Sequence, residues 1–309
     1  MRRSVVACVQ RSACSQCRSR TTCTLQQNPL SAAINPPPLP LFAASLSLSN
    51  SSSGIAEPTA AESRLPPLPE KSVFRRQLPE GLVAFSSALG RRHFAEAMAN
   101  GHLEPYFPLS EQFVTQNEPT FCGLGTLTMV MNALRIDPRR RWRDETGPGW
   151  RWWADEMFET SCSRSLEQIR AVGTTMEDIQ LLAVANGAES RMRRPTDEGE
   201  NLDTFRHSIV AACSSPRASF AVTSFCRATL GQTGSGHFSP IGGYHAPTDS
   251  ALILDVARFK YPPYWVPLPL LWKASLAVDT DTGLSRGWYE MSAAGETSAS
   301  HESVDWCST

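Results

Sequence analysis

One cysteine of this sequence stands where a thiol is suited to act as a nucleophile. Cys122 follows Pro119 in the stretch NEPTFCGLGTLTMVMNAL, and apolar residues recur after it at steps of three and four: Leu124, Leu127, Val130, Met131 and Leu134. That spacing predicts a helix with one buried face, which Pro119 is suited to precede. Cys122 is therefore expected at the helix N-terminus, where free N–H groups and the helix dipole stabilise a thiolate. The alternative is a small buried structural cysteine, as most free cysteines are.

A nucleophilic thiol needs a base, and two of the six histidines lie close together in the stretch GQTGSGHFSPIGGYHA. Three runs predict the strands of an antiparallel meander, with a bulge at Gly242–Gly243: residues 218–226, 237–246 and 251–259. His237 begins the second run and Asp255 lies within the third, so the imidazole and the carboxylate are expected to be cross-strand neighbours. A buried carboxylate needs such a partner. His245 is the rival base, and Asp249, in a turn, is the rival carboxylate.

A cysteine at a helix start, a histidine at a strand start and a carboxylate behind the histidine are the arrangement of papain-like cysteine nucleophiles. The Gly-rich turn also has the G-x4-G spacing of a phosphate loop at Gly231 and Gly236. However, His237–Phe238 stand where a phosphate loop requires Lys and Ser or Thr. The sequence therefore favours a cysteine nucleophile with a histidine base over phosphate binding.

The composition of the chain indicates which part must position these residues. Residues 1–56 contain no Asp or Glu and are rich in Arg and Ser. We therefore expect a disordered leader over residues 1–70, either an organellar transit peptide that directs the protein to a plastid or mitochondrion or an untargeted tail of a cytoplasmic protein. One catalytic domain is predicted over residues 74–290, with a flexible tail over 291–309 and no C-terminal Cys-rich domain.

Charge and cysteine spacing disfavour several other classes of protein. The net charge of −1 gives no basic field for nucleic acid, and no apolar run is long enough to span a membrane. The stretch 135–153 mixes Arg and Trp; it suits either an RNA surface or, as we expect, tryptophan packing under a solvated arginine loop. A non-catalytic metal-binding protein is disfavoured because the cysteines of the body lack close ligand spacing: Cys122, Cys162, Cys213 and Cys226. In the leader, Cys14 and Cys17 form a C-x2-C pair that could ligate zinc, but the gaps to Cys8 and Cys23 fit no common zinc module and the segment lacks any His.

Four long stretches resemble the phytochelatin synthase family, the glutathione γ-glutamylcysteinyltransferases: QNEPTFCGLGTLTMVMNALRIDP, GPGWRWW, QTGSGHFSPIGGYH and DSALILDVARFKYPPYWVPLPLLW. The resemblance runs from Phe74 to Tyr289. It implies an α+β, papain-like fold, with a helical part that carries the cysteine packed on an antiparallel sheet that carries the histidine and the aspartate. The catalytic residues that it implies are Cys122, His237, Asp255 and, as an oxyanion donor, Gln116.

The resemblance also implies an activity, which is transfer of the γ-Glu-Cys unit of glutathione with release of glycine. The expected partners are glutathione and phytochelatin peptides, without nucleic acid or membrane, and a homodimer is allowed. No tightly bound cofactor is expected, and Cd, Zn and Cu ions would activate as metal–glutathione thiolates. Family members usually carry further cysteines in the stretch 158–188, which here has only Cys162. This short architecture resembles bacterial-type members, so a glutathione hydrolase with the same site is the alternative.

Glutathione carries two carboxylates and an amine, so charged residues near the triad are expected to anchor it. Glu118 suits the α-amine, and Arg258 and Lys260 suit the carboxylates, although a regular strand would turn Arg258 away from Asp255. No protein-bound metal is predicted. The full set of predicted substrate-binding residues is Glu118, Gly236, Phe238, Ser239, Arg258, Lys260 and Tyr261.

Overall fold

Seven strands form one antiparallel sheet in the computed structural model, which describes residues 73–142, 149–161 and 164–295. The strand order is β1-β6-β5-β4-β3-β7-β2, and each neighbouring pair is antiparallel. The strands are β1 (Val83–Ala84), β2 (Ala188–Arg193), β3 (Ser219–Cys226), β4 (Gly236–His245), β5 (Ser250–Ile253), β6 (Tyr264–Pro267) and β7 (Trp288–Ala293).

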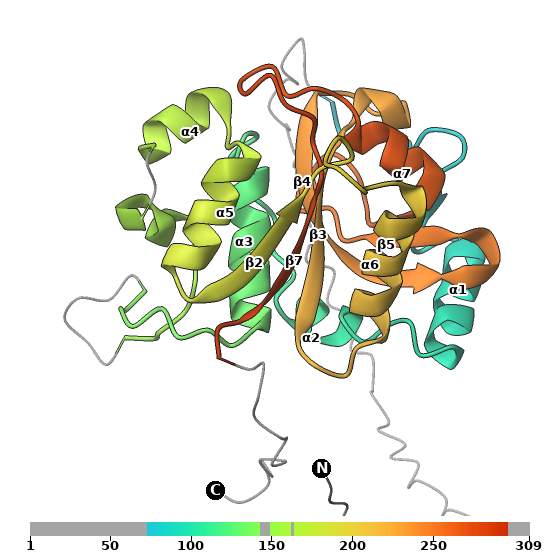
Figure 1. Ribbon diagram of the computed structural model, residues 1–309, viewed down its shortest axis with the longest axis horizontal. Coiled ribbons are helices and arrows are strands. Elements are labelled where there is room, and N and C mark those ends of the chain that lie inside the picture. Colours follow the sequence, from blue (N-terminus) through green and yellow to red (C-terminus); the bar gives the residue numbers. More distant parts are fainter. Residues whose placement is uncertain (1–72, 143–148, 162–163, 296–309) are drawn as a thin grey trace, which may run out of the picture. The chain divides into compact units, whose positions relative to one another are not determined.

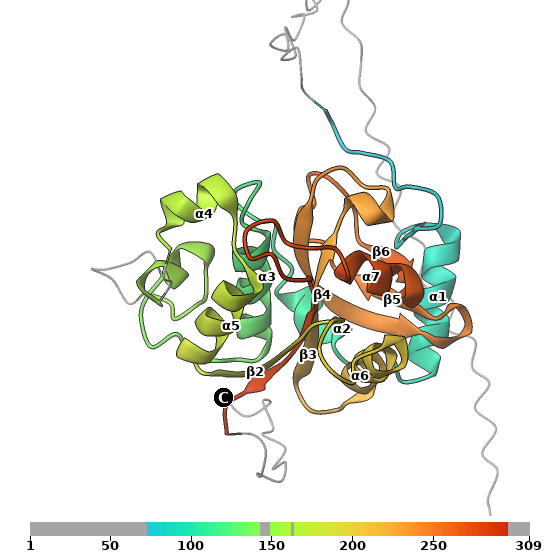
Figure 2. The ribbon, with the colours of Figure 1, turned by 45° about the horizontal axis from the view of Figure 1, so that its top comes forward.

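Helices cover both faces of this sheet, which confirms the predicted α+β class. Figures 1 and 2 show α3, α4 and α5 on one side of the central strands and α6 and α7 on the other. One apolar cluster joins α3 and α5 to the sheet, and a second joins α6 and α7 to its opposite face. The helices are α1 (Ala88–Ala99), α2 (Tyr106–Glu111), α3 (Cys122–Ala133), α4 (Leu166–Val172), α5 (Met176–Ala185), α6 (Leu202–Ser214) and α7 (Leu268–Ser275), with 3-10 turns η1 (Asp155–Ser161), η2 (Ala228–Leu230) and η3 (Ala246–Thr248).

Helix α3 begins at Cys122, as predicted, but the prediction that only one of its faces is buried is wrong. Every residue from Gly123 to Ala133 is buried, because the helix lies between the sheet and the layer formed by α5 and η1. Its polar side chains are satisfied there: Thr126 Oγ1 donates to the Phe238 carbonyl, Thr128 Oγ1 to Asp155 Oδ1 and Asn132 Nδ2 to the Trp153 carbonyl. A buried polar group with a partner avoids the cost of desolvation, so a mixed sequence can be enclosed.

The predicted meander of β3, β4 and β5 is confirmed, including the bulge, where the register shifts between Ile241 and Gly243. The third strand is shorter than predicted, since β5 ends at Ile253. The prediction that Asp255 lies within a strand is therefore wrong. Asp255 lies in the irregular segment between β5 and the turn at residues 258–260, where its Oδ1 accepts a hydrogen bond of 2.9 Å from the N–H of Ala257.

Strand β7 continues to Ala293, beyond the predicted end of the body at residue 290, because it pairs with both β2 and β3. The leader over 1–70, with its four cysteines, lies outside the described residues, as do Cys162 and residues 296–309 of the predicted tail. None of the helices in the described ranges is long and apolar enough to cross a membrane.

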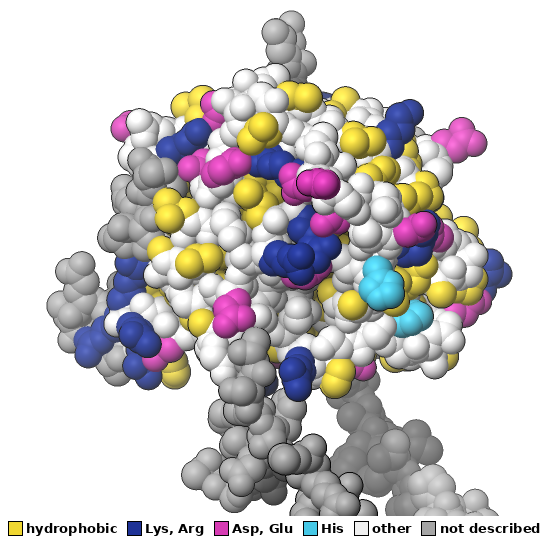
Figure 3. Space-filling view, viewed as in Figure 1, with side chains coloured by type: hydrophobic (Ala, Val, Ile, Leu, Met, Phe, Trp, Pro, Cys, Tyr) yellow, Lys and Arg dark blue, Asp and Glu magenta, His cyan; other side chains and the backbone are white. Residues whose placement is uncertain are grey.

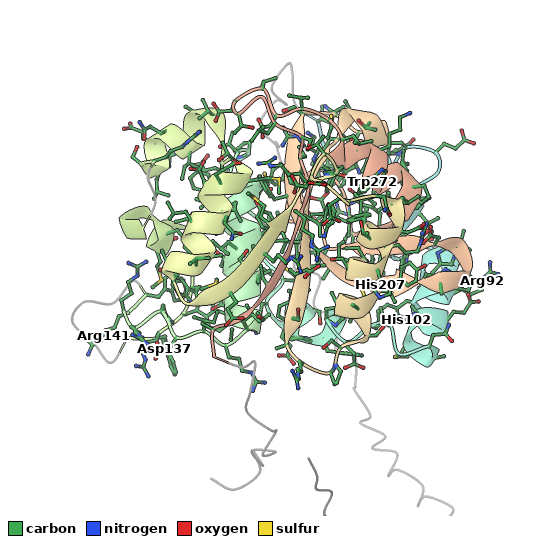
Figure 4. The ribbon with its side chains drawn as sticks, viewed as in Figure 1. Arg92, His102, Asp137, Arg141, His207 and Trp272 are labelled. Atoms are coloured by element: carbon green, nitrogen blue, oxygen red, sulfur yellow. The ribbon has the colours of Figure 1, made fainter. Side chains whose placement is uncertain are left out.

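The Arg- and Trp-rich stretch 135–153 begins where α3 ends. Trp153 is buried and stacks on Phe158 at 5.0 Å between ring centroids, while Trp150 is 79% exposed. Arg141 and Asp137 lie at the lower left of Figure 4, where Lys and Arg side chains gather in Figure 3. Trp153 therefore has the predicted packing role. Since α3 has 12 residues, its C-terminal end, which precedes this stretch, lies about 18 Å from its start at Cys122.

Candidate active site

The thiol of Cys122 is half-buried at the first position of α3. The preceding residue, Phe121, is the N-cap and offers the helix no side-chain hydrogen bond, and the first turn contains no acidic residue. The N–H groups of this turn therefore keep their positive potential, which favours negative charge on the sulfur and on an oxygen bound beside it.

Two glycines let neighbouring loops approach the start of α3. A Cβ on Gly123 would clash with Thr174 Oγ1 and would lie 2.8 Å from Ile179 Cδ1. A Cβ on Gly125 would lie 3.3 Å from Gln116 Cβ. The sequence C-G-L-G thus fixes Cys122 between the loop that precedes α5 and the loop that carries Gln116.

His237 is buried on β4 and is held by three groups. Its Nε2 lies 2.9 Å from Asp255 Oδ1 and 3.0 Å from Ser239 Oγ, and its ring meets Phe225 edge-on at 5.5 Å. Because Asp255 and Ser239 both contact Nε2, Nδ1 is the ring nitrogen left for the thiol of Cys122. The hydrogen bond of 3.1 Å from Thr126 to the Phe238 carbonyl joins the helix of the cysteine to the strand of the histidine.

The thiol and the imidazole change each other's ionisation. Burial disfavours the thiolate of Cys122, but the hydrogen bond and the charge of His237 outweigh burial and lower the pKa of the thiol. Burial likewise disfavours the imidazolium of His237, and the carboxylate of Asp255 outweighs it and raises the pKa of the imidazole. The two shifts favour a thiolate–imidazolium pair, which is the reactive form of a cysteine nucleophile.

Arg227 joins this site although the sequence reasoning did not include it. Its Nη2 lies 2.9 Å from each carboxylate oxygen of Asp255, and both side chains are almost fully buried. Burial disfavours the Asp255 carboxylate, but His237, Arg227 and the N–H of Ala257 together lower its pKa. The sequence indicated that this buried carboxylate needs a partner, and His237 was the one predicted. The position of Arg227, 28 residues from Asp255 in the chain, follows only from the fold.

The rival residues are occupied elsewhere. His245 Nε2 lies 2.7 Å from Glu96 Oε2, and its ring stacks on His93 at 4.2 Å. The carboxylate of Asp249 is bound by Arg206 and by the hydroxyl of Tyr244. Two further histidines, His102 and His207, lie on the side of the sheet that carries α6 (Figure 4). The geometry thus brings the predicted His237 and Asp255 to Cys122 and leaves the rivals apart.

Gln116 is buried beside the first turns of α3 rather than exposed on a loop. It is 3% exposed, its N–H donates to the Val256 carbonyl, and its Nε2 donates to the Glu118 carbonyl at 2.7 Å. Its Oε1 has no hydrogen-bond partner among the described residues. The carboxylate of Glu118 pairs with Arg170 on α4 at 3.1 Å.

The cationic residues predicted to bind substrate lie on the turn after Asp255. Arg258 is exposed, and its guanidinium carbon lies 4.6 Å from the centroid of the Phe113 ring. Since β5 ends at Ile253, the alternation of a regular strand does not determine the direction of the Arg258 side chain. Lys260 is half-buried, and burial and the nearby charge of Arg227 lower its pKa. Both ammonium and guanidinium groups remain suited to carboxylates.

Three of the other predicted substrate-binding residues are buried. Ser239 and Phe238 are 0% and 2% exposed, and Ser239 contacts His237 instead of an open surface. Tyr261 is 2% exposed and its hydroxyl accepts from the N–H of Thr233. Gly236 is half-buried, with the guanidinium of Arg286 occupying the place of a Cβ. Of these four, only Gly236 is partly exposed.

Two hollows, of about 390 and 990 Å³, share Arg135, Ile136 and Asp137 in their linings at the far end of α3, and neither includes the triad. Within the described ranges, no group of three or more His, Cys, Asp and Glu side chains is placed to hold a metal ion. The groups that Cys122, His237 and Asp255 bring together are a thiol, an imidazole and a carboxylate.

The sequence is similar to that of enzymes of one family. The family model described as phytochelatin synthase matches residues 73–288. A glutathione gamma-glutamylcysteinyltransferase of Schizosaccharomyces pombe is 44% identical over 219 residues, which are 71% of this chain and 51% of that protein. Glutathione gamma-glutamylcysteinyltransferase 3 of Lotus japonicus is 46% identical over 217 residues, 70% of this chain and 43% of that protein. The chain thus spans about half the length of these relatives or less.

Proposed function

The chain belongs to the phytochelatin synthase family, and on that premise we propose that it is an acyltransferase that makes phytochelatins from glutathione. In this proposal, each transfer of a γ-glutamylcysteinyl unit releases glycine and yields (γ-Glu-Cys)n-Gly peptides. The thiolates of these peptides chelate soft metal ions, so the biological role is heavy-metal detoxification. The observation that carries the proposal is the series of contacts from Asp255 through His237 to Cys122.

We assign the described residues to the papain-like fold, in which a helix that begins with the nucleophilic cysteine packs on an antiparallel sheet that carries the histidine. Three observations support this assignment. Helix α3 begins at Cys122, strand β4 carries His237, and Thr126 joins the helix to the strand by a buried hydrogen bond.

In the first step, the Cys122 thiolate attacks the carbonyl carbon of the Cys–Gly peptide bond of glutathione. The thiol proton has passed to Nδ1 of His237, which returns it to the glycine nitrogen as the C–N bond breaks. Asp255 accepts the Nε2–H hydrogen bond of His237 and so keeps Nδ1 free to take that proton. Glycine leaves, and a γ-glutamylcysteinyl thioester remains on Cys122.

Negative charge develops on the carbonyl oxygen during this attack. The N–H of Cys122 is one donor for that oxygen, and Gln116 is the other. Gln116 Nε2 has two hydrogens, of which one is donated to the Glu118 carbonyl, so the second remains for the oxyanion. Gln116→Ala should lower kcat for glycine release by about 10²–10³-fold with little change in KM, which steady-state kinetics would measure.

In the second step, the α-amine of a second glutathione, or of a phytochelatin, attacks the thioester and releases the Cys122 thiol. Arg258 and Lys260 are our proposed anchors for the glutathione carboxylates, because they lie on the turn that follows Asp255. If water attacks instead, the products are γ-glutamylcysteine and glycine, which is the hydrolase reaction.

Metal ions act in this proposal through the substrate. Cd, Zn or Cu bridging glutathione thiolates supplies an acceptor whose thiol is blocked, and a chelator should therefore stop peptide elongation without stopping glycine release. S-methyl-glutathione should support transfer in the absence of metal. If chelation abolishes glycine release, and added metal restores it with S-methyl-glutathione as the sole substrate, the metal acts on the protein.

The decisive experiment is mass spectrometry of the products that purified protein forms from glutathione, with and without cadmium. Elongated peptides are expected from the wild-type protein, and Cys122→Ser should abolish both glycine release and the thioester adduct. Cys213→Ser and Cys226→Ser are matched controls that should retain glycine release. A Cys122→Ser protein as active as the wild type would end the mechanism, whereas γ-glutamylcysteine as the only peptide product would identify a hydrolase.

We also propose that residues 1–70 direct the protein to a plastid or mitochondrion, because this stretch is rich in Arg and Ser and poor in acidic residues. A fluorescent protein fused to residues 1–70 should then enter one of these organelles. A fusion that remains in the cytoplasm would instead favour the cytoplasmic alternative.

A further inference from the structure

Arg227, at the end of β3, is a buried cation with unusually complete contacts. The residue is 3% exposed, and arginine is rarely buried so far unless it is paired. Its Nη2 binds both oxygens of Asp255, its Nη1 binds Gln232 Oε1, and the ring of Tyr261 lies 5.3 Å from its guanidinium carbon. These contacts direct the guanidinium toward the interior, behind the carboxylate that holds His237.

The charge of Arg227 balances that of Asp255 inside the protein. Without it, Asp255 would be a carboxylate buried with only His237 to compensate its charge, which is costly. With it, the pair of Asp255 and Arg227 has no net charge. Cys122 and His237 together also have no net charge, either as thiol and imidazole or as thiolate and imidazolium. Burial has the largest effect on the pKa of Cys122, His237 and Asp255. The Arg227 charge also acts on all three: it favours the thiolate of Cys122, the neutral imidazole of His237 and the carboxylate of Asp255.

The backbone of Arg227 also fixes the loop that leads to the histidine. Its N–H donates to the Ser235 carbonyl at 2.7 Å, and its carbonyl accepts from the N–H of Gln232 at 2.9 Å. These bonds close the turn between β3 and β4, so that Cys226 pairs with Gly236 and the next residue of β4 is His237. Side chain and backbone therefore act on the same two residues, Asp255 and His237.

We infer that Arg227 is a positioning residue, which orients Asp255 and neutralises its charge so that His237 can exchange a proton with Cys122. The kinetic consequences of this inference rest on the proposed function, whereas the effect of Arg227 on the Cys122 thiol does not depend on any substrate. In this inference, Arg227 acts through Asp255 and does not contact a glutathione carboxylate.

The test compares Arg227→Met and Arg227→Lys with a matched control, Arg217→Met. Arg217 is exposed and lies just before β3, at the opposite end of the strand from Arg227. Iodoacetamide alkylates the thiolate, so peptide mass spectrometry of Cys122 alkylation against pH gives the midpoint of thiol ionisation. Arg227→Met should raise that midpoint by about one pH unit, while Arg217→Met should leave it in place.

Kinetics of glycine release supply the second measurement. Arg227→Lys keeps the charge but loses the paired contacts, so it should leave the alkylation midpoint in place and lower kcat by about tenfold or more at unchanged KM. An unchanged midpoint in Arg227→Met, with a raised KM for glutathione, would instead make Arg227 a substrate contact and overturn the inference. A chain with no activity toward glutathione would end the proposed function, and the alkylation midpoint would still test Arg227.

Arg227→Met removes one charged partner of a buried carboxylate and can fail to fold, which circular dichroism would detect. In that case Gln232→Met provides the test, because it removes the partner of Nη1 without changing any charge. Lower kcat at unchanged KM in Gln232→Met and Arg227→Lys supports a positioning role. Wild-type kcat in both variants overturns it.

Discussion

Replacing Gly123 by alanine should move the cysteine of the site without unfolding the protein. The added Cβ would clash with Thr174 Oγ1 and would lie 2.8 Å from Ile179 Cδ1, so the start of α3 must shift away from the loop that precedes α5. Cys122 is the adjacent residue, and it must shift with the helix.

Two energies decide the size of the effect. Overpacking a buried site costs about 1–3 kcal/mol, while alanine is favoured over glycine within a helix by about 1 kcal/mol. The free energy of unfolding should therefore fall by about 0–2 kcal/mol. A displacement of the nucleophile on the order of 1 Å lowers a reaction rate by about 10²-fold, so activity should be far more sensitive than stability.

The assay is a double-mutant cycle between Gly123→Ala and Thr174→Ala, read by urea unfolding and by kcat/KM for glycine release. Thr174 Oγ1 is buried without a hydrogen-bond partner among the described residues, so its removal alone should cost little. In the double variant the closer of the two contacting atoms is gone and only Ile179 Cδ1 remains, so part of the lost rate should return, with a coupling energy of about 1–2 kcal/mol.

Gly125→Ala gives a graded comparison, because its Cβ would lie 3.3 Å from Gln116 Cβ, and it should lose less activity than Gly123→Ala. A Gly123→Ala protein that releases glycine at the wild-type rate would show that the added Cβ does not displace Cys122. If Thr174→Ala restores none of the lost rate, the contact with Thr174 is not what displaces Cys122.

Three further predictions concern charge and protonation. Asp255→Asn should lower the free energy of unfolding by about 3–5 kcal/mol in urea, because it leaves the Arg227 charge buried without its partner. The pKa of Asp255 is lowered in the folded state, so the carboxylate stabilises the fold above its unfolded pKa, and this contribution is lost as the pH falls through the folded pKa. Below pH 4, the free energy of unfolding should therefore fall less steeply in Asp255→Asn than in the wild-type protein. Burial and the charge of His245 lower the pKa of His93, so stability should decrease as the pH falls from 7 to 5, and less so in His93→Leu; equal slopes would contradict this. His237→Ala should abolish glycine release and His245→Ala should retain it, and equal losses in the two variants would leave the base unidentified.

Local sequence was sufficient for the start of α3 and for the meander of β3, β4 and β5. Helical spacing after Cys122 and the Gly-rich turn before His237 depend on neighbours in the chain, and both elements begin within one residue of their predicted positions. The order of these elements made His237 and Asp255 candidates, with His245 and Asp249 as rivals, but Asp255 lies beyond the end of β5 and not on a strand beside β4.

The tertiary structure decided the environment of those elements. Helical spacing predicted one buried face for α3, but the layer of α5 and η1 covers the other side, and Thr128 and Asn132 find partners there. The end of β5 at Ile253 was likewise not visible in the apolar run 251–259; beyond it, the Asp255 side chain accepts a hydrogen bond from the N–H of Ala257.

Arg227 is the clearest case of a residue that only the fold assigns. Its sequence neighbours, Cys226 and Ala228, mark it as a turn residue after a strand, and its partner Asp255 lies 28 positions away. Spacing along the chain reports on local elements, because helices and strands repeat over short distances. A buried charge is compensated by whichever group the folded chain brings within reach. For Asp255, the sequence determined that a partner was needed, and the tertiary structure determined that Arg227 joins His237 as that partner.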